Sequence, residues 1–279
     1  MKQALNNIKV RSEEIIRTLR WALPRNDKWQ AKVGTLLYHA GEIHHSAYSR
    51  ARYRYGVEIE FDFKFRGEEN LQPTAVVVRN LLRTTLGEKA YSVQRDESLA
   101  CGFEVVTAPL SLQTLKKLRV IFNDEDVMTC LHTQTLTSGL HITVDPFHTR
   151  AQERRFFDYF NNPKHIGALE KVIGRLPNKY CQFRDLSGGM CTIKNHNYVV
   201  HLRKNRALEV RVFKSPNTWE QFWQRLELTH KVNKLVRETN LSAVDIHKKI
   251  MRGIKKWLTQ HPKQDIMFYK VLDGRSPPQ

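Results

Sequence analysis

Apolar and acidic residues alternate between Arg54 and Phe63, in the stretch RYGVEIEFDF. Side chains of a β-strand point alternately to its two faces, so this period of two predicts a strand with one buried face. The other face would carry three carboxylates side by side: Glu58, Glu60 and Asp62. Carboxylates at this spacing repel one another, so the pattern is typical either of a strand face in open water or of a face that holds a cation.

The rest of the chain reads as strands flanked by helices. Alternation and composition predict further strands at 91–95, 103–107, 137–145, 198–203 and 208–213. Apolar residues at helical spacing predict two helices within 1–50 and others at 73–86, 111–121, 150–175 (interrupted at Pro163), 219–238 and 243–258. This order predicts an α+β fold with a mainly antiparallel sheet backed by helices. We divide it into an N-terminal helical extension (1–52), a sheet core (53–216) and basic C-terminal helices packed on the same domain (217–279).

Charge is distributed unevenly along the 279 residues, whose formal net charge is +18. Residues 56–145 contain 9 Lys and Arg against 13 Asp and Glu, whereas residues 203–279 contain 17 against 7. The acidic side chains therefore accompany the predicted strands, and the basic ones accompany the flanking helices. Such an excess of positive charge predicts attraction to an acidic partner, such as a nucleic acid, nucleotide phosphates or an acidic protein.

The sequence favours a cytoplasmic protein. No apolar run approaches the roughly 20 residues that cross a bilayer, so we predict no transmembrane segment, and the first residues lack the apolar region of a signal peptide. Its four cysteines have no C-x-x-C spacing, which favours reduced thiols over a disulfide framework or structural zinc.

Polar side chains recur on one face of several predicted strands. Glu104 alternates with apolar residues eight positions after Asp96, His141 shares a strand face with Thr143 and Asp145, and the sequence ALEVRVF puts Glu209 and Arg211 on one face. Each pattern alone is also typical of structural histidines and of surface ion pairs. Together they suggest a sheet face rich in carboxylates, and carboxylate oxygens favour Mg²⁺ or Mn²⁺ over zinc.

Four short motifs occur in an order that resembles the amidoligase branch of the glutamine synthetase and glutamate–cysteine ligase superfamily. They are G-V-E-I-E at 56–60, D-x-S-L-x₄-E-V-V-T-A-P at 96–109, G-L-H-I-T-V at 139–144 and L-E-V-R-V-F at 208–213. The resemblance covers about 54–216 and implies an antiparallel sheet curved into a half-barrel, with catalysis on its concave face. The chain departs from the family at Glu97, where a small residue usually follows the aspartate.

The resemblance also implies roles for individual residues. Glu60, Asp96 and Glu104 would hold one Mg²⁺ or Mn²⁺, and Glu58, His141 and Glu209 would hold a second near the phosphates of ATP. Arg211 would steady the transferred phosphoryl group, with Glu209 beside it in the catalytic site. Arg203 and Lys204 are candidate phosphate contacts, but the sequence favours a turn or surface position for both. Asp62 has no counterpart in the matched motifs, so we predict a rim or surface charge there.

The predicted activity is an ATP-dependent carboxylate–amine ligation through an acyl phosphate. Its substrates would be ATP, a carboxylate and an amine, either free or carried on an acidic macromolecule. One alternative is a nucleic-acid-binding protein with the same fold, suggested by the basic segments YSRARYRY and SAVDIHKKIMRGIKKWL. Another is a phosphotransferase that uses the same metal site.

Overall fold

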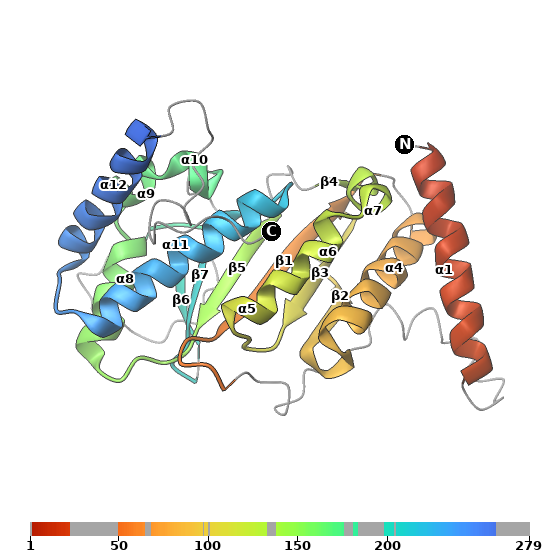
Figure 1. Ribbon diagram of the computed structural model, residues 1–279, viewed down its shortest axis with the longest axis horizontal. Coiled ribbons are helices and arrows are strands. Elements are labelled where there is room, and N and C mark those ends of the chain that lie inside the picture. Colours follow the sequence, from red (N-terminus) through yellow and green to blue (C-terminus); the bar gives the residue numbers. More distant parts are fainter. Residues whose placement is uncertain are drawn as a thin grey trace. The chain divides into compact units, whose positions relative to one another are not determined.

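The computed structural model describes residues 2–22, 50–64, 68–96, 98–99, 101–132, 138–175, 181–183, 198–203 and 205–260. The chain divides into two compact units (Figure 1). Unit 1 contains residues 1–140 and 215–219, and unit 2 contains residues 141–214 and 220–279. None of the described helices combines the length and the apolar character that a membrane span requires.

Unit 1 is an antiparallel sheet packed against helices. Strand β1 (Tyr55–Phe63) lies between β3 (Gly102–Thr107) and the short β4 (Leu131–His132), and β3 pairs on its other side with β2 (Tyr91–Arg95). The helices of this unit are α1 (Lys2–Ala22), α4 (Glu68–Leu86), η2 (Glu88–Ala90), α5 (Leu112–Leu115), η3 (Lys116–Leu118), α6 (Arg119–Phe122) and α7 (Glu125–Cys130).

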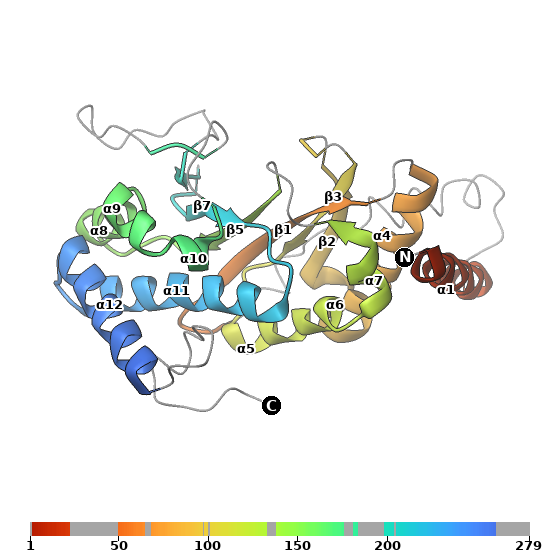
Figure 2. The ribbon, with the colours of Figure 1, turned by 90° about the horizontal axis from the view of Figure 1, so that it is seen from above.

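Burial of one face of β1 explains its alternating sequence. Val57, Ile59 and Phe61 are at most 1% exposed. The Phe61 ring lies 5.6 Å from the ring of Phe103 on β3 and 6.4 Å from that of Phe122 on α6, measured between ring centroids. This face therefore packs against helices, as Figure 2 shows for α6 and α7 beneath β1 and β3. The carboxylates of β1 point to the opposite face.

Helix α1 belongs to the packed part of unit 1. It lies along α4 and α7 (Figure 1), and its Arg11 guanidinium donates two hydrogen bonds to Asp124, at 2.6 and 3.0 Å. Because Asp124 also caps α7 through the N–H of Val127, this pair ties the two helices together at a helix N-terminus.

Unit 2 contains the second set of strands and the C-terminal helices. Strand β5 (Gly139–Val144) begins at the end of unit 1 and continues into unit 2, where the strand order is β5, β7 (Leu208–Lys214), β6 (Val200–Leu202), with β6 and β7 antiparallel. The helices are α8 (Arg150–Phe160), α9 (Pro163–Ala168), α10 (Glu170–Ile173), α11 (Trp219–Glu238) and α12 (Ala243–Gln260). Thr149 and Asn162 cap α8 and α9.

The predicted mixture of helices with antiparallel strands is confirmed. The strand at 91–95 and the helix at 219–238 have the predicted bounds, and Pro163 starts a new helix as expected. Helix α4 begins at Glu68 rather than at Pro73, so Pro73 lies inside the helix, where its missing N–H leaves one backbone hydrogen bond unmade. The predicted second helix within 1–50 lies outside the described residues.

Candidate metal and phosphate site

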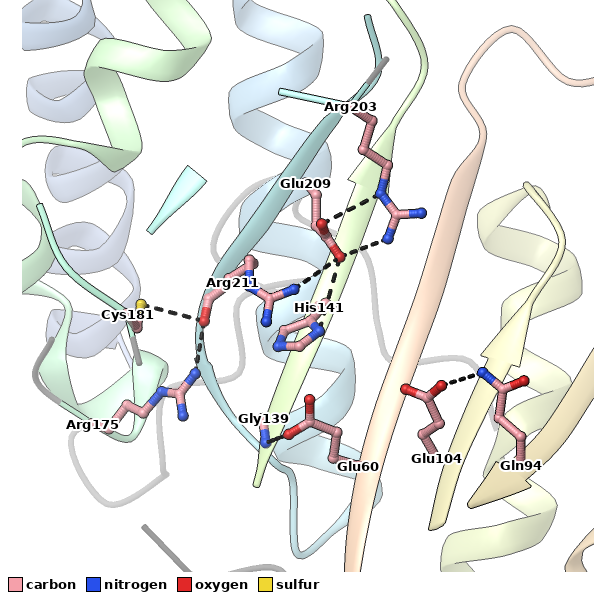
Figure 3. Close-up of polar contacts among 10 residues, drawn as sticks. All are labelled: Glu60, Gln94, Glu104, Gly139, His141, Arg175, Cys181, Arg203, Glu209 and Arg211. Carbon is pink, nitrogen blue, oxygen red and sulfur yellow. Dashed lines mark hydrogen bonds and ion pairs between the residues drawn. The ribbon is translucent and has the colours of Figure 1, made fainter. Parts of the chain in front are cut away.

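The sheet of unit 1 arranges acidic side chains in a row across neighbouring strands. Glu60 pairs directly with Glu104, and Glu104 pairs with Gln94. Paired residues of an antiparallel sheet point to the same face, so these three side chains lie side by side (Figure 3). Glu58 lies two residues before Glu60 on the same face of β1. The order of the strands thus brings together carboxylates that are more than 40 residues apart in the chain.

The neighbouring carboxylates change the chemistry of Glu104. Burial, followed by the negative charges of Glu58, Asp96 and Glu60, raises the pKa of Glu104 to about 7, against the opposing effect of a hydrogen bond from Gln94 Nε2. A carboxyl group with this pKa is half-protonated near neutral pH. A divalent cation would relieve the same repulsion, so the cluster has the charge and the oxygen donors that Mg²⁺ and Mn²⁺ require.

Glu60 and Asp96 are both held by backbone groups. Glu60 is 6% exposed, and its Oε2 accepts a hydrogen bond from the N–H of Gly139 at 2.6 Å (Figure 3). Its carbonyl oxygen accepts a second bond from Ser215 Oγ at 2.5 Å. Asp96 Oδ1 accepts the N–H of Ser98 at 2.8 Å, which fixes the turn between β2 and β3. Of the first predicted set of metal ligands, Glu60 and Glu104 are thus cross-strand neighbours, and the charges of Glu60 and Asp96 both act on Glu104.

Glu209 is the centre of a second cluster, in unit 2 (Figure 3). It is 1% exposed on β7. Its Oε1 lies 2.7 Å from Arg203 Nη2, 3.4 Å from Arg211 Nη1 and 3.9 Å from His141 Nδ1. Burial alone would raise the pKa of Glu209, but His141, Arg203 and Arg211 together hold it below its usual value. This carboxylate is therefore ionised and already compensated by cationic neighbours.

The predicted phosphate contacts have different surroundings. Arg203 follows β6, and its guanidinium donates both Nε and Nη2 to Glu209. Arg211 is 20% exposed in its side chain, and among the described residues its Nε is buried without a hydrogen-bond partner. The carbonyl oxygen of Arg211 accepts a bond from Arg175 Nη2 at 2.7 Å. Lys204 lies outside the described residues.

The prediction of a rim or surface position for Asp62 is wrong. Asp62 is 3% exposed, and neither of its carboxylate oxygens has a hydrogen-bond partner among the described residues. It is buried because the strand continues to Phe63 and pairs with both β3 and β4 at this point. The alternation that Asp62 shares with Glu58 and Glu60 predicts which strand face it lies on, but not how deeply it is buried.

Gln94 is a further contact that the sequence analysis did not single out. Its amide donates to Glu104, and only the register of β2 against β3 puts the two side chains together. A glutamine near the end of a predicted strand carries no distinguishing pattern of its own.

The two clusters suit different ligands. The cluster around Glu104 contains several carboxylates and therefore favours a cation. The cluster around Glu209 pairs one buried carboxylate with two arginines, and the free Nε of Arg211 is a donor suited to an anion such as a phosphate oxygen. Comparison of the chain with protein-family models and with curated proteins finds no match.

Proposed function

We propose that this chain is an ATP-dependent carboxylate–amine ligase that uses Mg²⁺ or Mn²⁺. The observation that carries the proposal is the acidic cluster of unit 1, in which burial and neighbouring carboxylates raise the pKa of Glu104 to about 7. The resemblance to amidoligases independently selects Glu60, Asp96 and Glu104 as ligands of one ion. The proposal includes the curved half-barrel sheet implied by that resemblance.

A second ion in the proposal would be bound by Glu58, His141 and Glu209, as the resemblance implies. The 3.9 Å approach of His141 Nδ1 to Glu209 Oε1 supports the part of this set that belongs to unit 2. A bound divalent cation neutralises the negative charge of phosphate oxygens. Because Arg203 already compensates Glu209, this second set would bind a cation only in competition with Arg203.

The reaction proceeds in two steps. A substrate carboxylate oxygen attacks the γ-phosphorus of ATP, so that a new O–P bond forms, the bond to the β,γ-bridging oxygen breaks, and ADP leaves. The amine nitrogen then attacks the acyl carbon, the bond to phosphate breaks, and the amide and phosphate are released with loss of a proton to solvent. Arg211 would hold the transferred phosphoryl group through its guanidinium, whose Nε is available for a further hydrogen bond.

Product analysis tests the reaction class. The protein is incubated with Mg-ATP and pooled amino acids and amines, and products are identified by mass spectrometry. We expect ADP together with a new species whose mass equals carboxylate plus amine less water. Glu104→Gln and Glu209→Ala should abolish it, whereas Glu125→Gln, at an exposed carboxylate on α7, should not. ADP without an amide would indicate a phosphotransferase. If the protein forms no product and also does not bind Mg-ATP, both the ligase and the phosphotransferase readings are refuted.

One observation favours nucleic-acid binding as a second candidate function. Helix α12 exposes five cationic side chains in two turns and a half, and Asp245 is the acidic residue in the helix. The cations are Lys248, Lys249, Arg252, Lys255 and Lys256. Ile246, Ile250 and Ile254 are buried on the other side of the helix. A basic helix face of this kind can follow a phosphate backbone.

A further inference from the structure

Asp62 differs from the other carboxylates of the acidic cluster in having no donor. Glu60 accepts the N–H of Gly139, and Glu104 accepts the amide of Gln94. Asp62 is only 3% exposed, yet both its carboxylate oxygens lack a hydrogen-bond partner among the described residues. Its side chain lies on the same face of β1 as Glu60, about 6.5–7 Å further along the strand. A bound group at this position would be adjacent to the cluster.

The apolar side chain of Leu99 lies over Gly102, the residue that pairs with Asp62 across the strands. Gly102 pairs with Asp62 across the strands, so both face the same side of the sheet. A Cβ built on Gly102 would lie 2.4 Å from Leu99 Cδ1, which means that Leu99 occupies the space that a side chain at Gly102 would need. The hydrogen bond from Ser98 N–H to Asp96 fixes the turn that brings Leu99 there. Leu99 is itself buried, at 6% exposure, and its side chain offers no hydrogen bond.

No described cation neutralises Asp62 from within unit 1. Lys64 follows two residues later, but its side chain is exposed and its Nζ donates to the carbonyl oxygen of Thr129 at 2.8 Å. Glu60, on the same face of β1, and Glu104, its partner on β3, carry the same sign as Asp62. The register partner of Asp62 on β4 is His132. A buried carboxylate without a donor or counter-ion is strongly unfavourable, so a positively charged group from outside the chain would stabilise it.

We infer that Asp62 binds the ammonium group of a primary amine, which is the second substrate class of the proposed ligase; the inference rests on that proposed function. A primary ammonium carries three N–H donors and an alkyl stem. The donors satisfy the two oxygens of Asp62, and the stem packs against Leu99. A divalent metal ion gains nothing from Leu99, because it prefers several oxygen ligands and retains water. In the proposed function, Glu60, Asp96 and Glu104 would provide such a set.

Ligand-observed NMR with ethylammonium, in the absence of ATP, measures this site directly in the full chain. We expect binding to wild type, no binding of tetraethylammonium, which lacks N–H donors, and at least about tenfold weaker ethylammonium binding in Asp62→Asn. Glu125→Gln removes one exposed carboxylate from the same unit and should bind as wild type. Asp62→Ser serves if Asp62→Asn does not fold.

Thermal unfolding and Mn²⁺ binding separate the alternatives. Without amine, Asp62→Asn should unfold at the same temperature as wild type or higher, because it removes an unpaired buried charge. A lower unfolding temperature with unchanged ethylammonium binding would mean a structural role and overturn the inference. Weaker Mn²⁺ binding with unchanged ethylammonium binding would make Asp62 a metal ligand, which overturns it equally.

The same measurements distinguish failure of this site from failure of the ligase proposal. If ethylammonium binds through Asp62 but no amide is ever formed, the ammonium site stands and the ligase proposal fails. If amide is formed and Asp62→Asn leaves the KM for the amine unchanged, the ligase proposal stands and the ammonium site is refuted.

Discussion

At the scale of single residues, Glu104 takes its properties from side chains on other strands. Its position in the sequence predicts an ordinary polar strand residue, whereas its neighbours Glu58, Asp96 and Glu60 help to raise its pKa to about 7. The folded protein therefore binds a proton at this site more tightly than the unfolded chain does. This difference makes the protonation of Glu104 measurable through stability.

Glu104→Gln should change the dependence of stability on pH. Because the pKa of Glu104 is raised from 4.5 to about 7 on folding, its contribution is fully present below about pH 4.5 and is lost as the pH rises to about 7. Urea unfolding in the presence of a chelator should show Glu104→Gln gaining stability relative to wild type across this interval. Added Mg²⁺ or Mn²⁺ should then stabilise wild type more than the variant. Parallel pH profiles for the two proteins would contradict the raised pKa.

Arg203 is the second residue whose removal has a defined consequence. Arg203→Ala removes two hydrogen bonds from the buried carboxylate of Glu209, at 2.7 and 3.3 Å. Arg211 and His141 remain, so we expect a loss of about 1–3 kcal/mol in the free energy of unfolding. If Arg203 competes with a cation for Glu209, the variant should also bind Mn²⁺ more tightly than wild type in a titration followed by electron paramagnetic resonance. Unchanged or weaker Mn²⁺ binding would exclude such competition.

At the scale of elements, unit 2 joins α9 and α12 through two histidine rings. The rings of His165 and His247 are stacked, with centroids 4.2 Å apart and an interplanar angle of 10°. Burial and then the neighbouring His165 lower the pKa of His247 to about 4, and burial also lowers the pKa of His165. The packed helices therefore require neutral imidazoles, which sequence spacing alone does not indicate.

The stacked pair should make the stability of unit 2 sensitive to acid. Because the pKa of His247 falls from 6.5 to about 4 on folding, its contribution is present above about pH 6.5 and is lost as the pH falls towards 4. His247→Phe keeps an aromatic ring but cannot be protonated, so its stability should decline less over this interval. Circular dichroism during urea unfolding measures the difference, with His148→Gln as an exposed control. An equal decline in His247→Phe and wild type would contradict the assignment.

At the scale of the whole molecule, charge is separated along the chain. The formal net charge is +18, yet the acidic cluster lies in the sheet of unit 1 and α12 of unit 2 presents its cations to solvent. Such a separation allows one protein to hold a cation in a sheet and to attract an acidic partner through a helix. The proposed polyanion binding and the proposed metal binding can therefore be tested with separate substitutions.

Salt dependence tests the role of α12. Replacement of Lys248, Arg252 and Lys255 by glutamine should weaken binding to single-stranded nucleic acid and reduce the slope of log affinity against log salt by up to about three. The control replaces three exposed cations of unit 1 by glutamine: Lys89, Lys117 and Arg119. Fluorescence anisotropy at several salt concentrations measures both. Equal effects of the two triple variants would indicate non-specific attraction by net charge, and an absence of binding at low salt would exclude this function.

Local pattern was enough to predict most of the elements and the polar face of β1. Alternation of apolar and acidic residues between 54 and 63 follows from the pleat of a strand, which needs no tertiary information. The same holds for α11 and for the start of α9 at Pro163, whose fixed backbone angle suits the first turn of a helix. The predicted ligand set of Glu60, Asp96 and Glu104 came from motif order, and Glu60 and Glu104 are neighbours because β1 pairs with β3.

Tertiary structure alone decided what those side chains experience. Asp62 has the same sequence pattern as Glu58, but its oxygens lie buried without partners among the described residues, where β1 pairs with both β3 and β4. Glu104 and Glu209 are both carboxylates on strand faces, yet the pKa of one rises and that of the other falls. Burial and the charges of residues brought from distant parts of the chain set these values, and neither can be read from the spacing of residues along a single strand.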